Sequence, residues 1–525
     1  MSETSQVTRA AGVVGAATFL SRIFGFIRDM VIAGVFGAGM GSDAFFVAFR
    51  IPNLLRRLFA EGSLSIAFIP VFTEYLERDG REAAFGLARS ALRLLSVILV
   101  VVTVAGILLS PLLVRFIAPG FADNPEKMAL TVTLTRITFP YIFFICLVAL
   151  CMGILNVLGH FAAPAVAPVF LNLAMIGSAL MISPRLEVPA IGLAIGVLIG
   201  GVCQLGLQLP FLAQKGFDFW KPAGLRHPGL VQVGRLMLPA VFGAAVYQIN
   251  ILVGTLLASL LPEGSVSYLY YADRVVQFPL GIFGIAMATA VLPSLSRQAA
   301  VGDFPALQRT FAHAVNLILF ITLPAMAGLI VLRAPIVALL FKRGAFDLET
   351  TRMTAAALFH YSVGLWAFSA VRIVVSTFYA LQDTRTPVRM ATLSILANIA
   401  LGILLMGPLA HGGLALATSL ASMINLTLLL GALRVRMGSM RWRPMLASTA
   451  RSAACAGVMA LAVAGCSGWL IPDLQADTAQ LGAGLAGSIF VGMALYAGLA
   501  GLARCPELNT VTGLIRRRPS RTPES

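Results

Sequence analysis

Long apolar stretches, separated by short polar turns, follow one another along nearly the whole chain. A membrane-spanning helix needs about 20 mostly apolar residues. The runs are continuous rather than alternating, which excludes a transmembrane β-barrel. The pattern predicts fourteen spans, at residues 8–37, 43–75, 83–113, 128–157, 164–183, 189–213, 230–260, 267–297, 306–333, 352–381, 388–407, 412–434, 447–470 and 480–503. We therefore expect an all-α polytopic membrane protein.

Composition supports this class. Of the 525 residues, 58% are hydrophobic and 11% are charged, with a mean hydropathy of +0.90. A soluble domain carries roughly 25% charged residues, so a water-soluble enzyme and a disordered chain are both excluded. The six cysteines form no CxxC pair, and most fall inside spans, where they behave as small apolar residues.

The net charge of +16 is distributed unevenly. Lys and Arg gather in alternate connections, within residues 78–93, 215–235 and 434–443 and in the C-terminal tail, whereas the turns GAGMGSD, LPEGSV and GPLAHGG carry none. This asymmetry follows the positive-inside rule. We therefore expect a multi-pass membrane protein with both termini in the cytoplasm, and no nucleic-acid partner. One loop, with Lys342, Arg343 and Arg352, departs from the rule.

Landmarks recur at nearly one offset along the sequence. Pairs separated by 224, 224 and 223 residues are Arg50 with Arg274, Asp123 with Asp347, and Pro164 with Pro387. A duplication of six spans fits this offset, and parallel repeats in transporters place the substrate between the halves. We expect two pseudo-symmetric six-helix lobes, at 1–215 and 216–437, around a central cationic cavity. Two extra helices and a basic tail would occupy 438–525.

Charge inside a span costs roughly 2.5–3.5 kcal/mol on insertion scales and indicates function by default. Here it concentrates in spans 1, 2 and 8, at Arg22, Arg28, Asp29, Asp43, Arg50, Arg56, Arg57, Glu61, Asp273 and Arg274. Arg28 and Arg274 each lie about ten residues from an outer turn, which places them ~15 Å deep. These arginines can therefore converge near the middle of the membrane.

The excess of arginine indicates the ligand class. A guanidinium matches phosphate with a planar fork and stays protonated, so a diphosphate or another polyanion is the expected guest. A drug or metal-cation exporter would instead need lone acids. The five histidines show no metal-ligand spacing, and no P-loop, GxSxG or HExxH motif occurs. We expect a transporter with no cofactor and no metal, rather than an enzyme.

Several segments resemble one family closely. They are SRIFGFIRD (21–29), FGAGMGSDAFFVAFRIPNLLRRLFAEG (36–62), APGF (118–121), ITFPYI (137–142), SVSYLYYADRVVQFPLG (265–281), LPSLS (292–296) and LQDTRTPV (381–388). Together they make the chain similar to the MurJ (MviN) lipid II flippases, of the superfamily that includes multidrug and oligosaccharidyl-lipid exporters. The resemblance implies two six-helix lobes with two extra helices, and a lipid tail lying along a groove of spans 13 and 14.

The same resemblance implies roles for individual residues. The essential cavity arginines of the family correspond to Arg22, Arg28, Arg56 and Arg274, and positions of secondary importance to Asp43, Arg50, Glu61 and Ser267. The position of Arg50 is often Lys in relatives, which keeps the charge. The position of Gln277 is an acid in some relatives, so a role of that acid in coupling or in balancing Arg274 does not transfer to this chain.

The implied activity is the movement of lipid II, the undecaprenyl-diphosphate-linked peptidoglycan precursor, from the inner to the outer leaflet by alternating access. The implied location is the bacterial cytoplasmic (inner) membrane. The energy source for transport is either the membrane potential or an ion gradient. The sequence shows no clear sodium site. Expected partners are lipid II, membrane lipids and proteins of cell-wall synthesis, and we expect a monomer. The alternatives are export of another polyprenyl-linked glycan or a drug on the same fold, an enzyme acting on lipid diphosphates, and a scaffold for cell-wall assembly.

Overall fold

The structure is a computed structural model that describes residues 3–58, 64–438, 442–471 and 473–516, and the regular elements in these ranges are all helices. The chain forms two compact units. The first comprises Met1–Ser267 with Arg343–Phe346, and the second comprises Tyr268–Lys342 with Asp347–Ser525. The expectation of an all-α membrane protein is confirmed.

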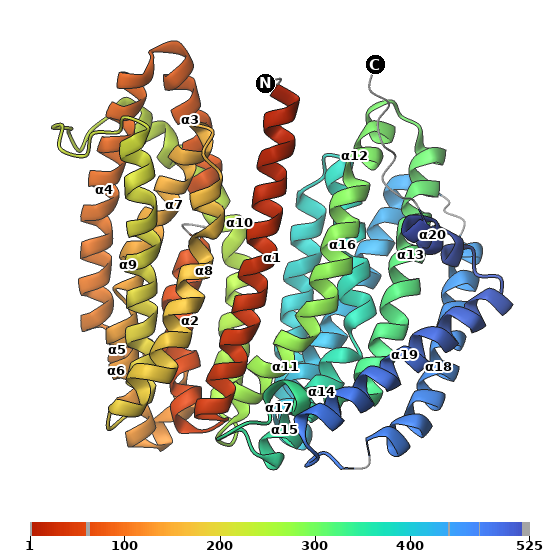
Figure 1. The fold of residues 1–525 in the computed structure, drawn as a ribbon. Coiled ribbons are helices and arrows are strands. Elements are labelled where there is room, and N and C mark those ends of the chain that lie inside the picture. The colour runs from red at the N-terminus through yellow and green to blue at the C-terminus, as the bar shows by residue number, and fades with distance from the viewer. Residues whose placement is uncertain (1–2, 59–63, 439–441, 472, 517–525) are drawn as a thin grey trace. The chain divides into compact units, whose positions relative to one another are not determined.

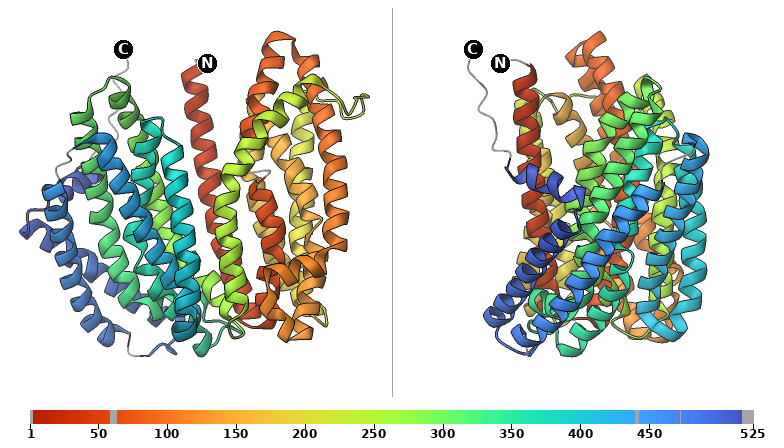
Figure 2. Two further views of the ribbon diagram at one scale, coloured as in Figure 1. Left: turned by 180° about the vertical axis from the view of Figure 1, so that it is seen from behind. Right: turned by 90° about the vertical axis from the view of Figure 1, so that its right-hand side faces the viewer.

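The described part of the first unit contains ten α-helices: α1 (Glu3–Phe36), α2 (Met40–Leu58), α3 (Ser65–Arg78), α4 (Arg81–Leu108), α5 (Ser110–Ile117), α6 (Pro125–Thr138), α7 (Tyr141–Val157), α8 (Ala162–Gly177), α9 (Ala190–Gln214) and α10 (Pro228–Ser259). Helix α8 packs against both α1 and α9 (Figure 1). Helix α10 packs against α2 and α3, as seen from behind in Figure 2. Helix α2, in turn, packs on α6.

Two local features fix the helices that carry charge in this unit. Helix α6 begins at Pro125 because the side chain of Asn124 accepts a hydrogen bond from the Lys127 amide at 3.1 Å. Helices α8 and α9 approach closely because α9 carries glycine at the crossing. A Cβ on Gly200 would lie 2.6 Å from Leu171 Cδ1, so a larger residue there would push α8 away from α9.

The second unit is built from α11 (Ser265–Pro279, whose first three residues belong to the first unit), α12 (Ala286–Ala300), α13 (Phe304–Val331), α14 (Arg333–Phe341), α15 (Leu348–Ser362), α16 (Leu365–Ala380), α17 (Arg385–Met437), α18 (Trp442–Leu470), α19 (Thr478–Leu502) and α20 (Pro506–Arg516). Its buried core joins α13, α16 and α18 through side chains such as Phe311, Ile373 and Met459. The two C-terminal apolar helices, α18 and α19, pack on each other and on α13.

Within the described residues, nine helices are long and apolar enough to cross a membrane, or ten if the bent pair α15 and α16 forms one span. The number rises to eleven when α17 is divided at Ala410, where φ is +47° and the helix kinks. Helices α1, α2 with α3, and α10 correspond to the three remaining predicted spans. The predicted count of about fourteen is therefore in rough agreement with the structure.

Proline and glycine set the breaks inside these long helices. Pro279 ends α11, and a π-helical turn (η5, Leu280–Ile285) follows it before α12 begins. In α17 the kink brings Gly413 against the preceding half, where a Cβ would lie 2.1 Å from the Leu405 carbonyl oxygen. The lobe boundaries at 215/216 and 437/438 stay predictions, because a unit defined by packing need not end where a repeat ends.

Candidate functional site

The start of α2 carries a buried polar cluster that lies entirely within the first unit. The Asp43 carboxylate accepts hydrogen bonds from Lys127 Nζ at 2.8 Å and from the Gly264 amide at 2.8 Å. Its other oxygen accepts from the Ser267 amide at 3.0 Å and from the Ser267 hydroxyl at 2.6 Å. Asp43 and Ser267 are 1% and 0% exposed. Two sequence-predicted residues therefore meet here, bonded to each other.

Lys127 supplies the opposite charge in this cluster. Its ammonium group is 4.3 Å from the Phe121 ring centroid as well as bonded to Asp43, and the residue is 6% exposed. The carboxylate also faces the first backbone amides of α11, where the helix dipole favours a negative charge. Sequence reasoning missed Lys127. The available signal was its place just before span 128–157, beside the APGF segment.

The middle of α1 holds a second charged group. Arg28 donates to Oδ1 of Asp29 through Nε at 3.0 Å and through Nη2 at 2.7 Å. Its remaining terminal nitrogen, Nη1, donates to Oδ1 of Asn172 on α8 at 3.1 Å. The Arg28 and Asp29 side chains are 13% and 3% exposed. Arg22, two turns earlier on α1, is exposed.

The later part of α2 carries the next predicted arginines. Arg50 donates through Nη1 to the hydroxyl of Thr255 on α10, and Arg56 donates through Nε to Oδ1 of Asn53 at 2.9 Å. Both arginines are half-buried. Glu61, the remaining predicted acid of this span, lies outside the described residues.

Arg274 belongs to the second unit and is described there by itself. Its guanidinium lies 4.7 Å from the ring centroid of Tyr270, one turn earlier on α11, and Nη2 lies 3.3 Å from the Tyr270 hydroxyl oxygen. Gln277 donates to the carboxylate of Asp273. The Gln277 side chain therefore contacts an acid one turn earlier on the same helix.

Beyond these residues, the described ranges contain no group of three or more His, Cys, Asp or Glu that could hold a metal ion. The turn before α17 contains Asp383, whose carboxylate accepts from the Thr386 amide at 3.0 Å and from the Thr386 hydroxyl at 2.7 Å. These bonds, the backbone one above all, lower the pKa of Asp383 below its usual value. Asp383 therefore acts as a helix cap.

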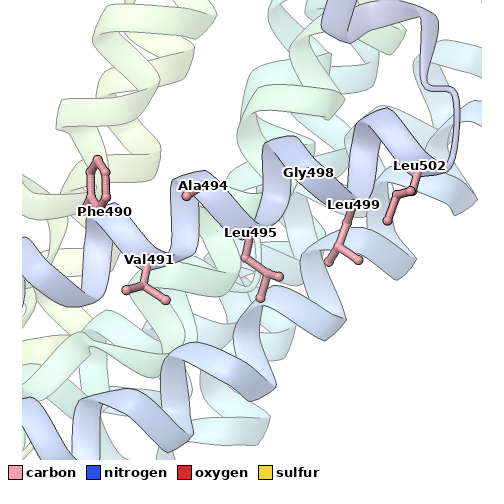
Figure 3. A pocket seen from close by; sticks show the side chains of 7 residues that line it. All are labelled: Phe490, Val491, Ala494, Leu495, Gly498, Leu499 and Leu502. Atoms are coloured by element: carbon pink, nitrogen blue, oxygen red, sulfur yellow. The ribbon is translucent and has the colours of Figure 1, made fainter.

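Helix α19 carries an open apolar pocket of about 440 Å³. Figure 3 shows its lining side chains, with Val491, Leu495, Leu499 and Leu502 on one side of the helix. Phe490 and Leu502 are 68% and 83% exposed. A row of large aliphatic side chains at helical spacing, half-buried from Val491 to Leu499 and exposed at Leu502, suits hydrocarbon as its surroundings.

Comparison with protein families matches residues 32–473 to the family described as "Lipid II flippase MurJ". A relative from Vibrio cholerae, named "Probable lipid II flippase MurJ", is 42% identical over 81% of this chain and 82% of its own length. A relative of the same name from Rhizobium meliloti is 39% identical over 93% of this chain and 92% of its own length. A Burkholderia cenocepacia relative, named "Lipid II flippase MurJ", is 38% identical over 82% and 84% of the two chains.

Comparison with solved structures agrees with this family assignment. A structure titled "Lipid II flippase MurJ, inward closed conformation" aligns with a TM-score of 0.77 and 26% identity, covering 96% of this chain and 99% of the other. An inward-facing multidrug resistance MATE family transporter of the MOP superfamily aligns with a TM-score of 0.68 over 82% and 99% of the two chains. At 16% identity, that second likeness shows a shared fold alone.

Proposed function

Because the chain belongs to the lipid II flippase MurJ family, we propose that it moves lipid II from the inner to the outer leaflet of the cytoplasmic membrane. Flipping a lipid is transport and needs no covalent chemistry, so the chain is a transporter rather than an enzyme. The observation that carries the proposal is the family match over most of the chain, together with arginines inside α1, α2 and α11.

The proposed substrate contacts are electrostatic. Arg22, Arg28, Arg56 and Arg274 bind the diphosphate, because a guanidinium pairs with phosphate oxygens through parallel charge-assisted hydrogen bonds. Arg50, Asp43, Glu61 and Ser267 contact the sugar-peptide headgroup or set the local charge balance. In support, Arg50 donates to the Thr255 hydroxyl and Arg56 to the Asn53 amide oxygen, and hydrogen bonds of this kind orient a guanidinium.

The lipid tail would remain in hydrocarbon while the headgroup moves. The pocket of α19, with its aliphatic row from Val491 to Leu502, is the surface that we assign to the tail. The headgroup passes by alternating access of two six-helix lobes, with both termini in the cytoplasm. The drive is the membrane potential or an ion gradient. A potential supplies about 2.3 kcal/mol per charge per 100 mV.

A depletion strain tests the proposal. Arg28→Ala and Arg274→Ala are each expressed in bacteria depleted of their own lipid II flippase, with Arg28→Lys as a variant that keeps the charge beside Asp29. We expect neither alanine variant to restore growth at normal membrane expression, and Arg28→Lys to restore it in part. Normal growth with both alanine variants would contradict the assigned site.

The substrate itself needs a separate measurement, because another polyprenyl-linked glycan or a drug on the same fold is the alternative. Purified protein in vesicles is assayed for flipping of labelled lipid II, with unlabelled lipid II or another lipid-linked sugar as competitor. We expect lipid II to compete well and the other lipid to compete poorly. Equal competition would favour the broader exporter. Turnover of the lipid to a new product would favour an enzyme.

A further inference from the structure

Asn172 is a buried amide in the middle of the otherwise apolar helix α8. It is the one polar side chain of Ala162–Gly177, and it is 6% exposed. A polar group inside an apolar helix is unfavourable unless it is hydrogen-bonded. Both ends of the Asn172 amide are hydrogen-bonded to α1, at Ser21 and at Arg28. Arg28 lies 144 residues before Asn172 in the sequence.

The two bonds fix which way the amide points. Oδ1 accepts from Arg28 Nη1 at 3.1 Å, and Nδ2 donates to the Ser21 carbonyl oxygen at 3.1 Å. An arginine can only donate and a carbonyl can only accept, so the reverse orientation would lose both bonds. Gly25 lies between these two points of α1, and a Cβ there would be 3.6 Å from Nδ2. The amide therefore bridges two turns of one helix face.

Arg28 is consequently held from two sides. Asp29 bonds Nε and Nη2, and Asn172 bonds Nη1. Bonds at all three nitrogens define the plane of the guanidinium and therefore the direction that it presents to a ligand. We propose that Asn172 is a positioning residue that orients Arg28 for the diphosphate of the lipid substrate. This inference rests on the proposed function.

A neutral acceptor suits this task better than a second carboxylate. Asp29 already places one negative charge beside Arg28. An acid at position 172 would offer the same bond to Nη1 but would bring a second negative charge, and it would turn an acceptor toward the Ser21 carbonyl. An amide orients the guanidinium and adds no charge of its own.

The test is a double-mutant cycle on substrate affinity. Purified wild type, Asn172→Leu, Arg28→Gln and the double variant are titrated with lipid II in detergent, and thermal unfolding checks that each is folded. Asn172→Leu is expected to weaken binding about tenfold, the scale of one hydrogen bond to a charged group. In the Arg28→Gln background the same change is expected to have less than a twofold effect. Equal effects in both backgrounds would overturn the inference.

Two further variants sharpen this result. Asn172→Asp keeps the side-chain volume, and it takes the place of Asn172→Leu in the double-mutant cycle if Asn172→Leu does not fold. We expect it to weaken binding at least as much as Asn172→Leu, because the added charge competes with the diphosphate. Gln208→Leu is the matched control, since Gln208 is a fully buried amide of α9 with no hydrogen-bond partner at either amide atom in the described structure. It should leave affinity unchanged.

The outcomes separate this inference from the proposed function. If Arg28→Gln binds lipid II as well as wild type, the site assignment under the proposed function fails and the positioning role falls with it. If Arg28→Gln binds poorly while Asn172→Leu and Asn172→Asp bind normally, only the positioning role is wrong. If Gln208→Leu weakens binding as much as Asn172→Leu, loss of any buried amide explains the result and the inference is overturned.

Discussion

The charged residues at the start and in the later part of α2 differ in how deeply they are buried. At the start of the helix, Asp43 is buried and receives four hydrogen bonds, one of them from the buried cation Lys127. Later in the same helix, Arg50 and Arg56 are half-buried and donate to the neutral oxygens of Thr255 and Asn53. The difference teaches that charges on one helix can differ in burial, and that the buried one, Asp43, holds the start of α2 to α6 and α11 within the first unit.

The largest expected effect comes from breaking the buried cluster. Asp43→Ala leaves Lys127 as an uncompensated buried cation and removes the bonds to Gly264 and Ser267, so we expect a loss of about 3–5 kcal/mol of stability. Thermal unfolding in detergent measures this loss. Adding Lys127→Met to Asp43→Ala should recover part of it, because the unpaired charge is then gone. An unchanged unfolding temperature for Asp43→Ala would contradict an architectural role.

The opposite pattern is expected for an arginine assigned to the ligand. Arg22→Ala should leave the unfolding temperature within a few degrees of wild type, because Arg22 is exposed. Flipping of labelled lipid II in vesicles should fall by about tenfold or more, since charge-assisted bonds to a diphosphate are lost. If instead stability falls and transport per folded molecule does not, Arg22 belongs with the architectural charges.

Substitutions of Arg50 separate the effect of its positive charge from that of its planar guanidinium. Arg50→Lys keeps the positive charge but has no planar fork, so we expect transport to fall less than about threefold, whereas Arg50→Met should fall further. The vesicle assay reports both variants, and equal unfolding temperatures show that folding is not the cause. A lysine variant as impaired as the methionine variant would show that the bond to Thr255 matters more than the charge.

The smallest effect is expected at the cap of α17, outside the spans. Asp383→Ala removes the acceptor for the Thr386 amide, at a cost of about 1 kcal/mol at neutral pH. Folding lowers the pKa of Asp383, so its contribution is present above the unfolded value of about 3.9 and is lost as the pH falls through the folded value. Unfolding measured between neutral pH and pH 3 should show wild type and variant converging. A constant difference would exclude the carboxylate as its source.

Much of the fold follows from the apolar pattern, because a helix that crosses a membrane must satisfy its own backbone and shows this as one long apolar run. The kink in α17 was predicted as a break between 407 and 412, since proline and glycine interrupt the run there. Among the described residues, the count of apolar helices rises from nine toward fourteen only after broken helices, and helices rich in charge such as α2, are included.

The site was predictable by residue type but not by partner. The resemblance indicated Asp43 and Ser267, yet nothing in the sequence joined them to each other or to Lys127, because these contacts link residues 84 and 224 positions apart. Asn172 was missed although it is the one polar side chain of α8. A lone amide in an apolar helix is a signal that sequence analysis can use.

The crossing between α1 and the 343–346 segment has a mechanical consequence. The Ala345 amide donates to the Gly34 carbonyl at 2.8 Å, and a Cβ on Gly37 would lie 2.4 Å from the Ala345 carbonyl oxygen. Because backbone lies directly against backbone here, α1 has little room to shift at this point, whereas Arg28 lies nine residues away, about 14 Å along the helix. A tilt of α1 by about ten degrees around this contact would move the Arg28 guanidinium sideways by about 2 Å, which is enough to break its hydrogen bond to Asn172.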